Sequence, residues 1–154
     1  MRLHYYNGGK YTLKAWIDAG CKMDIIHKLN KLPLKASFEN FDMCHAGCEI
    51  SDWNKDNESA LLWDRTHFNA MWDIDYVDTF MIHGHTPIPY MDDYLYRVDC
   101  DSLVSPGVFW YCKDDRGIKH KCNIDCGAFF TGHTALLNLD TFEQHLFMAE
   151  DCVY

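Results

Sequence analysis

Apolar residues recur along the chain with two periods, one typical of helices and one typical of strands. Residues 12–19 carry apolar side chains at helical spacing, and Gly20 follows them as a residue that suits the C-terminal end of a helix. A second apolar stripe predicts a helix that starts near residue 24. It should end before Pro33, because a residue that precedes proline disfavours helical backbone.

Later in the chain the apolar pattern favours strands. Residues 38–45 alternate as one strand would, and residues 80–82 form an apolar run that reads as the end of a buried strand. Gly84 is expected to let the backbone turn tightly after that run, at a position where a Cβ atom would be costly. Further strand patterns follow, of which the first two flank a polar turn and predict a hairpin: residues 108–112, 118–124 and 135–139.

The remaining segments are more polar or ambiguous. Residues 51–57 and 73–79 are expected to be loops, and residues 60–65 a short helix or turn. Residues 88–107 lack periodicity and predict a long surface connection, which is uncommon unless it is functional. Residues 142–149 fit a helix and a returning strand equally well. Without an internal repeat or a linker, the pattern indicates a single domain over residues 1–154.

Composition narrows the class of protein. A globular chain of 154 residues should bury roughly 70% of its unfolded surface, and a hydrophobic fraction of 48% is ordinary for such a chain. The net charge of −9 argues against nucleic acid or an anionic membrane as a partner. No apolar run suits a membrane span, and the N-terminus lacks the apolar core of a signal peptide, so we expect a cytoplasmic protein.

The cysteines and histidines raise the alternative of a metal-binding module. The chain has eight Cys and nine His but no Cys-x-x-Cys pair. Cys44 and Cys48, like Cys122 and Cys126, are four positions apart, which matches zinc knuckles poorly. Without a secretory signal, disulfides are not favoured either. We therefore expect most of these thiols to be small core residues, with a Cys/His zinc-binding module as the less favoured reading.

Five short sequences stand out, in this order: NGGKYTL at residues 7–13, CHAG at 44–47, LLWDR at 61–65, HGHTP at 83–87 and NIDCGA at 123–128. They resemble the N-G-G-x-x-T, H-A-G, L-L-W-x-R, G-H-T-P and I-D-T-G-A motifs of the calcineurin-like metallophosphoesterases, especially the bacterial and phage serine/threonine protein phosphatases. Each motif is short, but the shared order over nearly the whole chain makes the resemblance specific.

The resemblance implies both a fold and a chemistry. The expected fold is an α/β sandwich (α/β/β/α), with metals bound at the C-terminal edge of a sheet. The expected reaction is hydrolysis of phosphomonoesters by a water that a pair of divalent metals, Mn, Fe or Zn, activates. His45 and His85 match two ligands of the second metal, each with an acceptor that fixes its tautomer. Arg65 matches the arginine that binds the substrate phosphate.

Three further residues receive structural roles. His83 is expected to pack near the site without binding metal. Asp125 and Gly127 are expected to shape the sheet beneath the site. Residues 88–107, which follow the histidine loop, are where we would look for substrate selectivity.

The resemblance also implies that part of the site is missing. The family's domain opens with D-x-H, G-D-x-x-D-R and G-N-H-E/D motifs, none of which occurs in this chain, and Met1 lies only six residues before Asn7. We therefore expect the C-terminal half of a phosphatase, an incomplete sandwich that lacks the N-terminal strands and helices. Because most metal ligands and the general acid belong to the absent motifs, the chain alone should be inactive.

The expected partners follow from this reading. They are a phosphate-ester or phosphoprotein substrate and an N-terminal-half partner chain or a second copy in a homo-oligomer, with no nucleic acid and no membrane. The main alternative is a non-catalytic remnant that serves as a binding or assembly module, because the missing half would leave a large apolar patch exposed.

Overall fold

The computed structural model describes residues 9–65, 79–93, 109–113 and 117–148. The chain divides into two compact units, residues 1–33 and residues 34–154. The expectation of one domain stays a prediction. In the described ranges, no helix is long and apolar enough to cross a membrane.

The first unit consists of two short helices, as the apolar stripes predicted. Helix α2 spans Lys10–Asp18 and helix α3 spans Met23–Leu29. Gly20 follows α2 with a φ of +81°, a conformation that glycine adopts without steric cost. No side chain of either helix is buried. The helix α3 ends before Pro33, so the proline is not needed to stop it.

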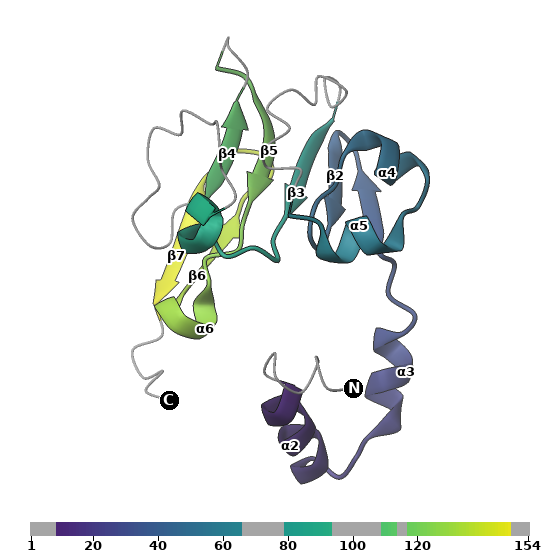
Figure 1. The fold of residues 1–154 in the computed structure, drawn as a ribbon. Coiled ribbons are helices and arrows are strands. Elements are labelled where there is room, and N and C mark those ends of the chain that lie inside the picture. The colour runs from purple at the N-terminus through teal and green to yellow at the C-terminus, as the bar shows by residue number, and fades with distance from the viewer. Residues whose placement is uncertain (1–8, 66–78, 94–108, 114–116, 149–154) are drawn as a thin grey trace. The chain divides into compact units, whose positions relative to one another are not determined.

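The second unit is built on a five-stranded mixed sheet with strand order β1-β2-β3-β5-β4. Strands β2, β3 and β5 run parallel, while β1 and β4 lie antiparallel at the two edges (Figure 1). The strand bounds are Lys35–Phe38 for β1, Phe41–Cys44 for β2, Phe80–His83 for β3, Trp110–Lys113 for β4 and Lys119–Asn123 for β5. Because β2, β3 and β5 are parallel, the loops that leave their C-terminal ends emerge at one edge of the sheet.

The core lies on both faces of β3, of which every residue is buried. Phe80 and Ile82 belong to one apolar cluster and Met81 to another, as the two-residue period of a strand requires. The Met81 side is covered by helices α4, Ile50–Asn54, and α5, Glu58–Trp63.

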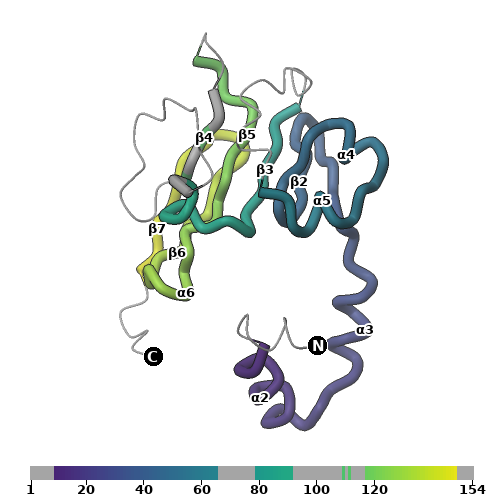
Figure 2. The backbone as a smooth tube through the Cα atoms, in the orientation of Figure 1, coloured from purple at the N-terminus to yellow at the C-terminus, as the bar shows by residue number. Residues whose placement is uncertain are grey.

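A two-stranded sheet covers the other face. Strand β6 spans His133–Leu137 and pairs antiparallel with β7, Gln144–Met148. Ala135 and Leu137 pack against the apolar cluster that contains Phe80. The hairpin β6–β7 lies toward β4 and β5, away from α4 and α5, as the tube in Figure 2 shows. Helices, the large sheet and the small sheet thus form three layers, and the mixed α/β class predicted from the sequence is confirmed.

Two sequence-based assignments are wrong. Residues 38–45 do not form one strand, because the chain turns at Glu39, whose φ is +50°, and pairs Phe38 with Phe41 across the β1–β2 hairpin. Residues 51–57 are not a loop, because α4 occupies most of that stretch and buries Trp53.

Several other assignments are resolved or confirmed. The β4–β5 hairpin and the strand near 135–139 are present, and the ambiguous C-terminal segment is the strand β7. The connection after residue 87 begins with a 3-10 helix, η3, over Ile88–Asp93. The expectations for residues 73–78 and 94–107 lie outside the described residues.

Candidate functional site

Two histidines that are far apart in the sequence meet at the C-terminal edge of the large sheet. His45 directly follows β2, and His85 follows β3 after Gly84. His45 Nε2 and His85 Nδ1 are 3.0 Å apart, and the ring centroids are separated by 4.8 Å. The two loops are also joined through the backbone, because the Gly84 N–H donates to the His45 carbonyl at 2.9 Å. The structure therefore brings the two predicted ligands together.

The spacing of the two ring nitrogens suits a shared ion as well as a hydrogen bond. With metal–nitrogen distances of about 2.0–2.1 Å, two neighbouring ligands of one ion have nitrogens roughly 2.9–3.4 Å apart in octahedral or tetrahedral geometry. The observed 3.0 Å lies in this range. His45 and His85 would thus need little movement to bind one ion.

The backbone at His85 is strained, and this overturns the expectation for Gly84. His85 has a φ of +70°, which a residue with a Cβ atom rarely adopts and which concentrates at functional sites. Gly84 has no positive φ, and a Cβ atom there would meet nothing closer than the Asp125 Cβ at 3.5 Å. The turn after β3 therefore depends on the conformation of the histidine and not on the glycine.

Two buried polar residues hold His85 in this conformation. Thr86 is fully buried, and its N–H donates to the Gly84 carbonyl at 2.8 Å. Asn123, at the end of β5, donates from Nδ2 to the Thr86 carbonyl at 2.7 Å and accepts from the Asp125 N–H at 3.0 Å. A buried Asn with partners on both sides fixes the loop against the neighbouring strand.

Arg65 lies beside the same loop. It follows α5, and its Nη1 donates to the Thr86 Oγ1 at 2.9 Å. The His45 loop is tied to that helix as well, because the Ala46 N–H donates to the Leu61 carbonyl at 2.8 Å. The three residues predicted for the site therefore lie close together, on loops linked by hydrogen bonds.

The environment of His85 favours the neutral imidazole. Its pKa is lowered below the ordinary value, mainly because burial disfavours the charged form. Electrostatic interactions with Arg65 and His45 lower the pKa of His85 further, while the Asp125 carboxylate raises it. The Trp63 ring stands edge-on to His85, with centroids 5.6 Å apart. A neutral imidazole can donate a lone pair to a metal.

The described residues supply only part of a metal site. In the ranges that the structure describes, no group of three or more His, Cys, Asp or Glu could hold an ion. The buried Nε2 of His85 has no hydrogen-bond partner within these ranges, so the acceptor expected to fix its tautomer is not found there. Because a metal in a protein normally has four or more donors, two imidazoles would need ligands from elsewhere.

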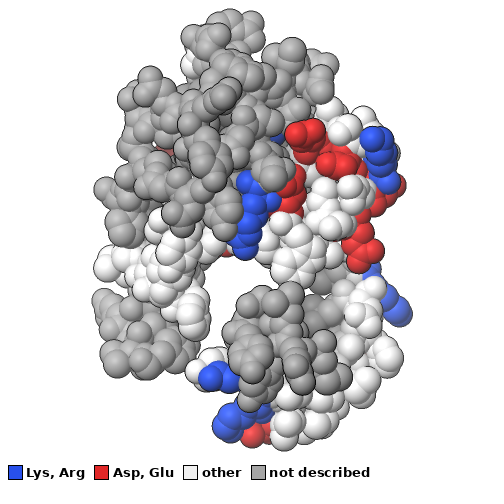
Figure 3. All heavy atoms as spheres, in the orientation of Figure 1, with Lys and Arg blue, Asp and Glu red and all other residues white. Residues whose placement is uncertain are grey.

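The charge beside the histidine pair differs from the charge of the surface over α4 and α5. Acidic side chains gather over α4 and α5 in the view of Figure 3. Asp52 belongs to α4, and Glu58 belongs to α5. An anion that reached the histidine pair would therefore depend on Arg65 for local attraction. The negative net charge of the whole chain would not help it.

The residues expected to be structural lie close to the site. His83 is 1% exposed and belongs to β3. Asp125 accepts a hydrogen bond from the Gly127 N–H at 2.9 Å, and Gly127 has a φ of +68°. These two residues shape the turn that follows β5.

The sequence analysis missed the roles of Thr86 and Asn123. Both residues lie inside the conspicuous motifs, but no pattern in those motifs says which member binds a ligand and which member holds the loop. Asn123 ends a strand that reads Lys-His-Lys-Cys-Asn, so one more polar residue does not stand out in the sequence. Its burial, which requires hydrogen-bond partners, is visible only in the structure.

No family model, no curated protein and no solved structure matches the chain. Function must therefore be inferred from the side chains of the site.

Proposed function

We propose that this chain contributes His45, His85 and Arg65 to the active site of a metal-dependent phosphoesterase that hydrolyses phosphomonoesters, of the calcineurin-like kind. The observation that carries the proposal is the approach of His45 Nε2 to within 3.0 Å of His85 Nδ1, beside an arginine. Two converging imidazoles and a guanidinium are suited to a metal-bound phosphate, because each interacts with a different part of it.

Each residue has a distinct task in this proposal. His45 and His85 would hold one ion of a divalent pair of Mn, Fe or Zn. That pair would supply an activated water and a clamp on the phosphate oxygens. Arg65 would bind two phosphate oxygens through its planar guanidinium. Its hydrogen bond to Thr86 orients the guanidinium beside His85.

The proposal extends to the fold and to the missing ligands. Parallel strands with functional loops at one edge, and a second sheet behind the first, support an α/β/β/α sandwich of which this chain would form the later part. The remaining metal ligands and the proton donor would come from an N-terminal half outside this sequence. The chain by itself would bind a metal weakly and would not turn over a substrate.

Metal binding tests the histidine pair directly. Substoichiometric Mn²⁺ should broaden the NMR signals of the His45 and His85 rings in the full chain, because the paramagnetic ion relaxes nearby nuclei. The variants His45→Ala and His85→Ala should each abolish the broadening of the other ring. His145→Ala, at an exposed position of β7, serves as the matched control. Equal broadening of all histidines would contradict the proposal.

Reconstitution tests the reaction. The chain would be mixed with a polypeptide that carries the D-x-H, G-D-x-x-D-R and N-H-E/D motifs, in the presence of Mn²⁺ and an aryl phosphate. We expect hydrolysis from the mixture and from neither half alone, with a loss of at least about tenfold in kcat/KM for Arg65→Ala. If assembled halves stay inert, the chain is not the second half of a phosphatase.

A binding or assembly module is the second candidate, and the helical unit favours it. Several apolar side chains of α2 and α3 are exposed, among them Leu13 at 46%, Ile17 at 54% and Leu29 at 59%. Such exposure is typical of surfaces that bind a partner. A monodisperse monomer in sedimentation experiments, at all concentrations tested, would argue against a homo-oligomeric module.

A further inference from the structure

A second hollow opens beside the His85 loop. Pro87 and Tyr90 line it from the start of η3, and the segment around α6, Ala128–Thr131, lines it from the other side. Its volume is about 580 Å³. Small-molecule sites typically have volumes of roughly 300–1,000 Å³, so the hollow is large enough for an organic group.

Aromatic rings form the wall of this hollow. Tyr90 and Phe130 lie with ring centroids 4.8 Å apart and planes tilted by 33°. Phe129 is 79% exposed although it stands on a helical turn that is held firmly, with the Thr131 Oγ1 donating to the Gly127 carbonyl at 3.0 Å. Three aromatic side chains around one hollow present flat apolar surfaces that a planar ring can contact.

Gly127 also lines the hollow, in contact with the Phe130 ring. A Cβ atom on Gly127 would lie 2.5 Å from Phe130 Cζ and 3.2 Å from the Pro87 Cβ. The Phe130 ring therefore rests directly against the Gly127 main chain, in a position that any side chain at residue 127 would block. The aromatic wall thus depends on a glycine in the turn that follows β5.

The hollow lies near the histidine site. Asp125 lines the hollow, and its Cβ is 3.5 Å from the position of a Cβ on Gly84. Pro87 is two residues from His85, which places their Cα atoms within about 7 Å of each other. A ligand of modest length could therefore reach from the histidine pair into the hollow.

The charged side chains near the hollow indicate which end of such a ligand would lie in it. Among the described residues that line the hollow, Asp125 is the one that is charged, so an anionic group is disfavoured there. Arg65 is not among the described residues that line the hollow; it hydrogen-bonds Thr86 in the His85 loop, where it would attract an anion. The phosphate would bind at the histidines and Arg65, and an uncharged ring would fill the hollow.

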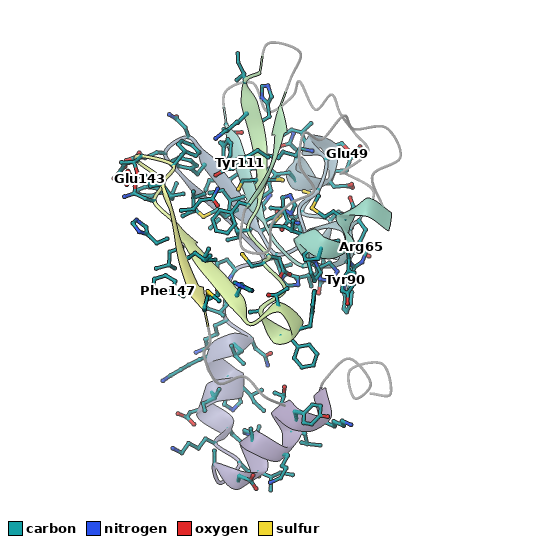
Figure 4. All side chains as sticks on the ribbon, turned by 90° about the vertical axis from the view of Figure 1, so that its left-hand side faces the viewer. Glu49, Arg65, Tyr90, Tyr111, Glu143 and Phe147 are labelled. Atoms are coloured by element: carbon teal, nitrogen blue, oxygen red, sulfur yellow. The ribbon has the colours of Figure 1, made fainter. Side chains whose placement is uncertain are left out.

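We propose that the hollow binds the aromatic group of a phosphate monoester whose ring is attached a few bonds from the phosphate, with Tyr90, Phe129 and Phe130 as the residues that set this preference. The inference rests on the proposed phosphoesterase function and names its substrate class. Arg65 and Tyr90 are on one side of the view in Figure 4, and Phe147, which offers a matched control, is on the other.

The test compares two esters that differ only in the ring. Binding of 3-phenylpropyl phosphate and of propyl phosphate to the full chain would be measured by ligand-observed NMR titration in the presence of Zn²⁺. We expect the ester with the ring to bind roughly tenfold more tightly, from the apolar area that it buries. Phe129→Ser should reduce the difference to less than about twofold, because most of the exposed aromatic surface is lost. Phe129→Leu should give an intermediate difference.

Phe147→Ser provides the control, because Phe147 is also exposed, at 49%, and lies on β7. This variant should leave the preference unchanged. Equal binding of the two esters, or an unchanged preference in Phe129→Ser, would overturn the ring site. A dimer that forms through the hollow, seen as self-association that Phe129→Ser removes, would overturn it as well.

A third probe separates this inference from the proposed function. If 3-phenylpropanol binds as tightly as its phosphate, and Arg65→Ala changes neither affinity, the phosphate site is wrong and the ring site stands. If Arg65→Ala weakens both esters equally while the ring contributes nothing, the phosphate site stands and the ring site is wrong.

Discussion

The two units of this protein use the same kinds of apolar residue with opposite outcomes. Around the large sheet, side chains such as Leu61 and Met81 are fully buried between layers. In the helical unit, Leu13 and Leu29 follow an equally regular pattern, yet no side chain of α2 or α3 is buried. The comparison shows that apolar periodicity selects the type of element, whereas burial requires a second surface that packs against it.

The difference also explains where the candidate site lies. A histidine pair needs loops that are held within a few tenths of an ångström, and only layers packed on each other provide such restraint. The loops after β2 and β3 are fixed by buried neighbours, including Thr86 and Asn123. Matched substitutions in the two units therefore test whether packing differs between them as the structure indicates.

The largest effect is expected from one leucine in each unit. Leu61→Ala should lower the free energy of unfolding by about 2–5 kcal/mol, because Leu61 is 0% exposed and its removal leaves a cavity. Leu29→Ala should change it by no more than about 0.5 kcal/mol, because Leu29 is 59% exposed. Urea denaturation followed by circular dichroism measures both. Similar losses for the two variants would mean that α3 is packed in solution.

A smaller contrast is expected between two glycines with positive φ. Gly127→Ala adds backbone strain and a clash with the Phe130 ring, where the new Cβ would lie 2.5 Å from Cζ, and should cost about 2–4 kcal/mol. Gly20→Ala has a φ of +81° but meets nothing within 4 Å, so only the strain of about 1 kcal/mol remains. Thermal unfolding of the two variants measures the difference, and equal costs would show that Phe130 moves aside freely.

These contrasts also show how far the sequence could predict the fold. The β4–β5 hairpin and the buried strand β3 followed from apolar runs. The β1–β2 turn did not, because the positive φ falls on Glu39 and not on the Asn40 that follows it, although asparagine is the residue that usually adopts that conformation in such a turn. Helix α4 was missed because its one buried residue, Trp53, stands in a polar stretch where no period is visible.

The sequence predicted which residues form the site, but it did not predict the interactions that hold them in place. The motif resemblance named His45, His85 and Arg65, and the parallel strands β2 and β3 explain why the two histidines meet. The tight turn was assigned to Gly84, whereas the positive φ lies at His85. Backbone conformation at a single residue depends on tertiary hydrogen bonds such as that from Asn123 to Thr86, which the local sequence does not encode.

The two units should also differ in how readily one cysteine of each ionises as the pH rises. Burial raises the pKa of Cys122 from 9.0 to about 12, so its thiol stays protonated where an ordinary thiol ionises. Since the folded pKa is the higher one, the stability from this group is complete below pH 9 and is lost as the pH rises from about 9 to about 12. Cys122→Ala should flatten the fall in stability over that range.

Alkylation provides a direct measurement of the same contrast. At pH 8.5, iodoacetamide should modify the exposed Cys21 of the helical unit at least about tenfold faster than the buried Cys122, because the thiolate is the reacting form. Mass spectrometry of timed samples gives both rates. Equal rates would show that β5 opens readily, and the sheet would then not be the rigid support that the histidine pair requires.

The smallest effect is expected from one lysine in each unit. Lys35 pairs with Asp56 at 2.7 Å, donates to the Trp53 carbonyl and lies 4.7 Å from the centroid of the Trp53 ring. Its side chain is 26% exposed, and Lys35→Ala should cost about 1–2 kcal/mol, because a carbonyl and a ring lose their partner. Lys14 pairs with Asp18 one helical turn away, with side chains 74% and 61% exposed, and Lys14→Ala should cost no more than about 0.5 kcal/mol.

Raising the salt concentration should erase the effect at Lys14 and preserve most of the effect at Lys35, since the packing of Lys35 on Trp53 is not screened. If both effects vanished in salt, the contacts of Lys35 would be no more than a surface ion pair, and β1 would be held to α4 by apolar packing alone.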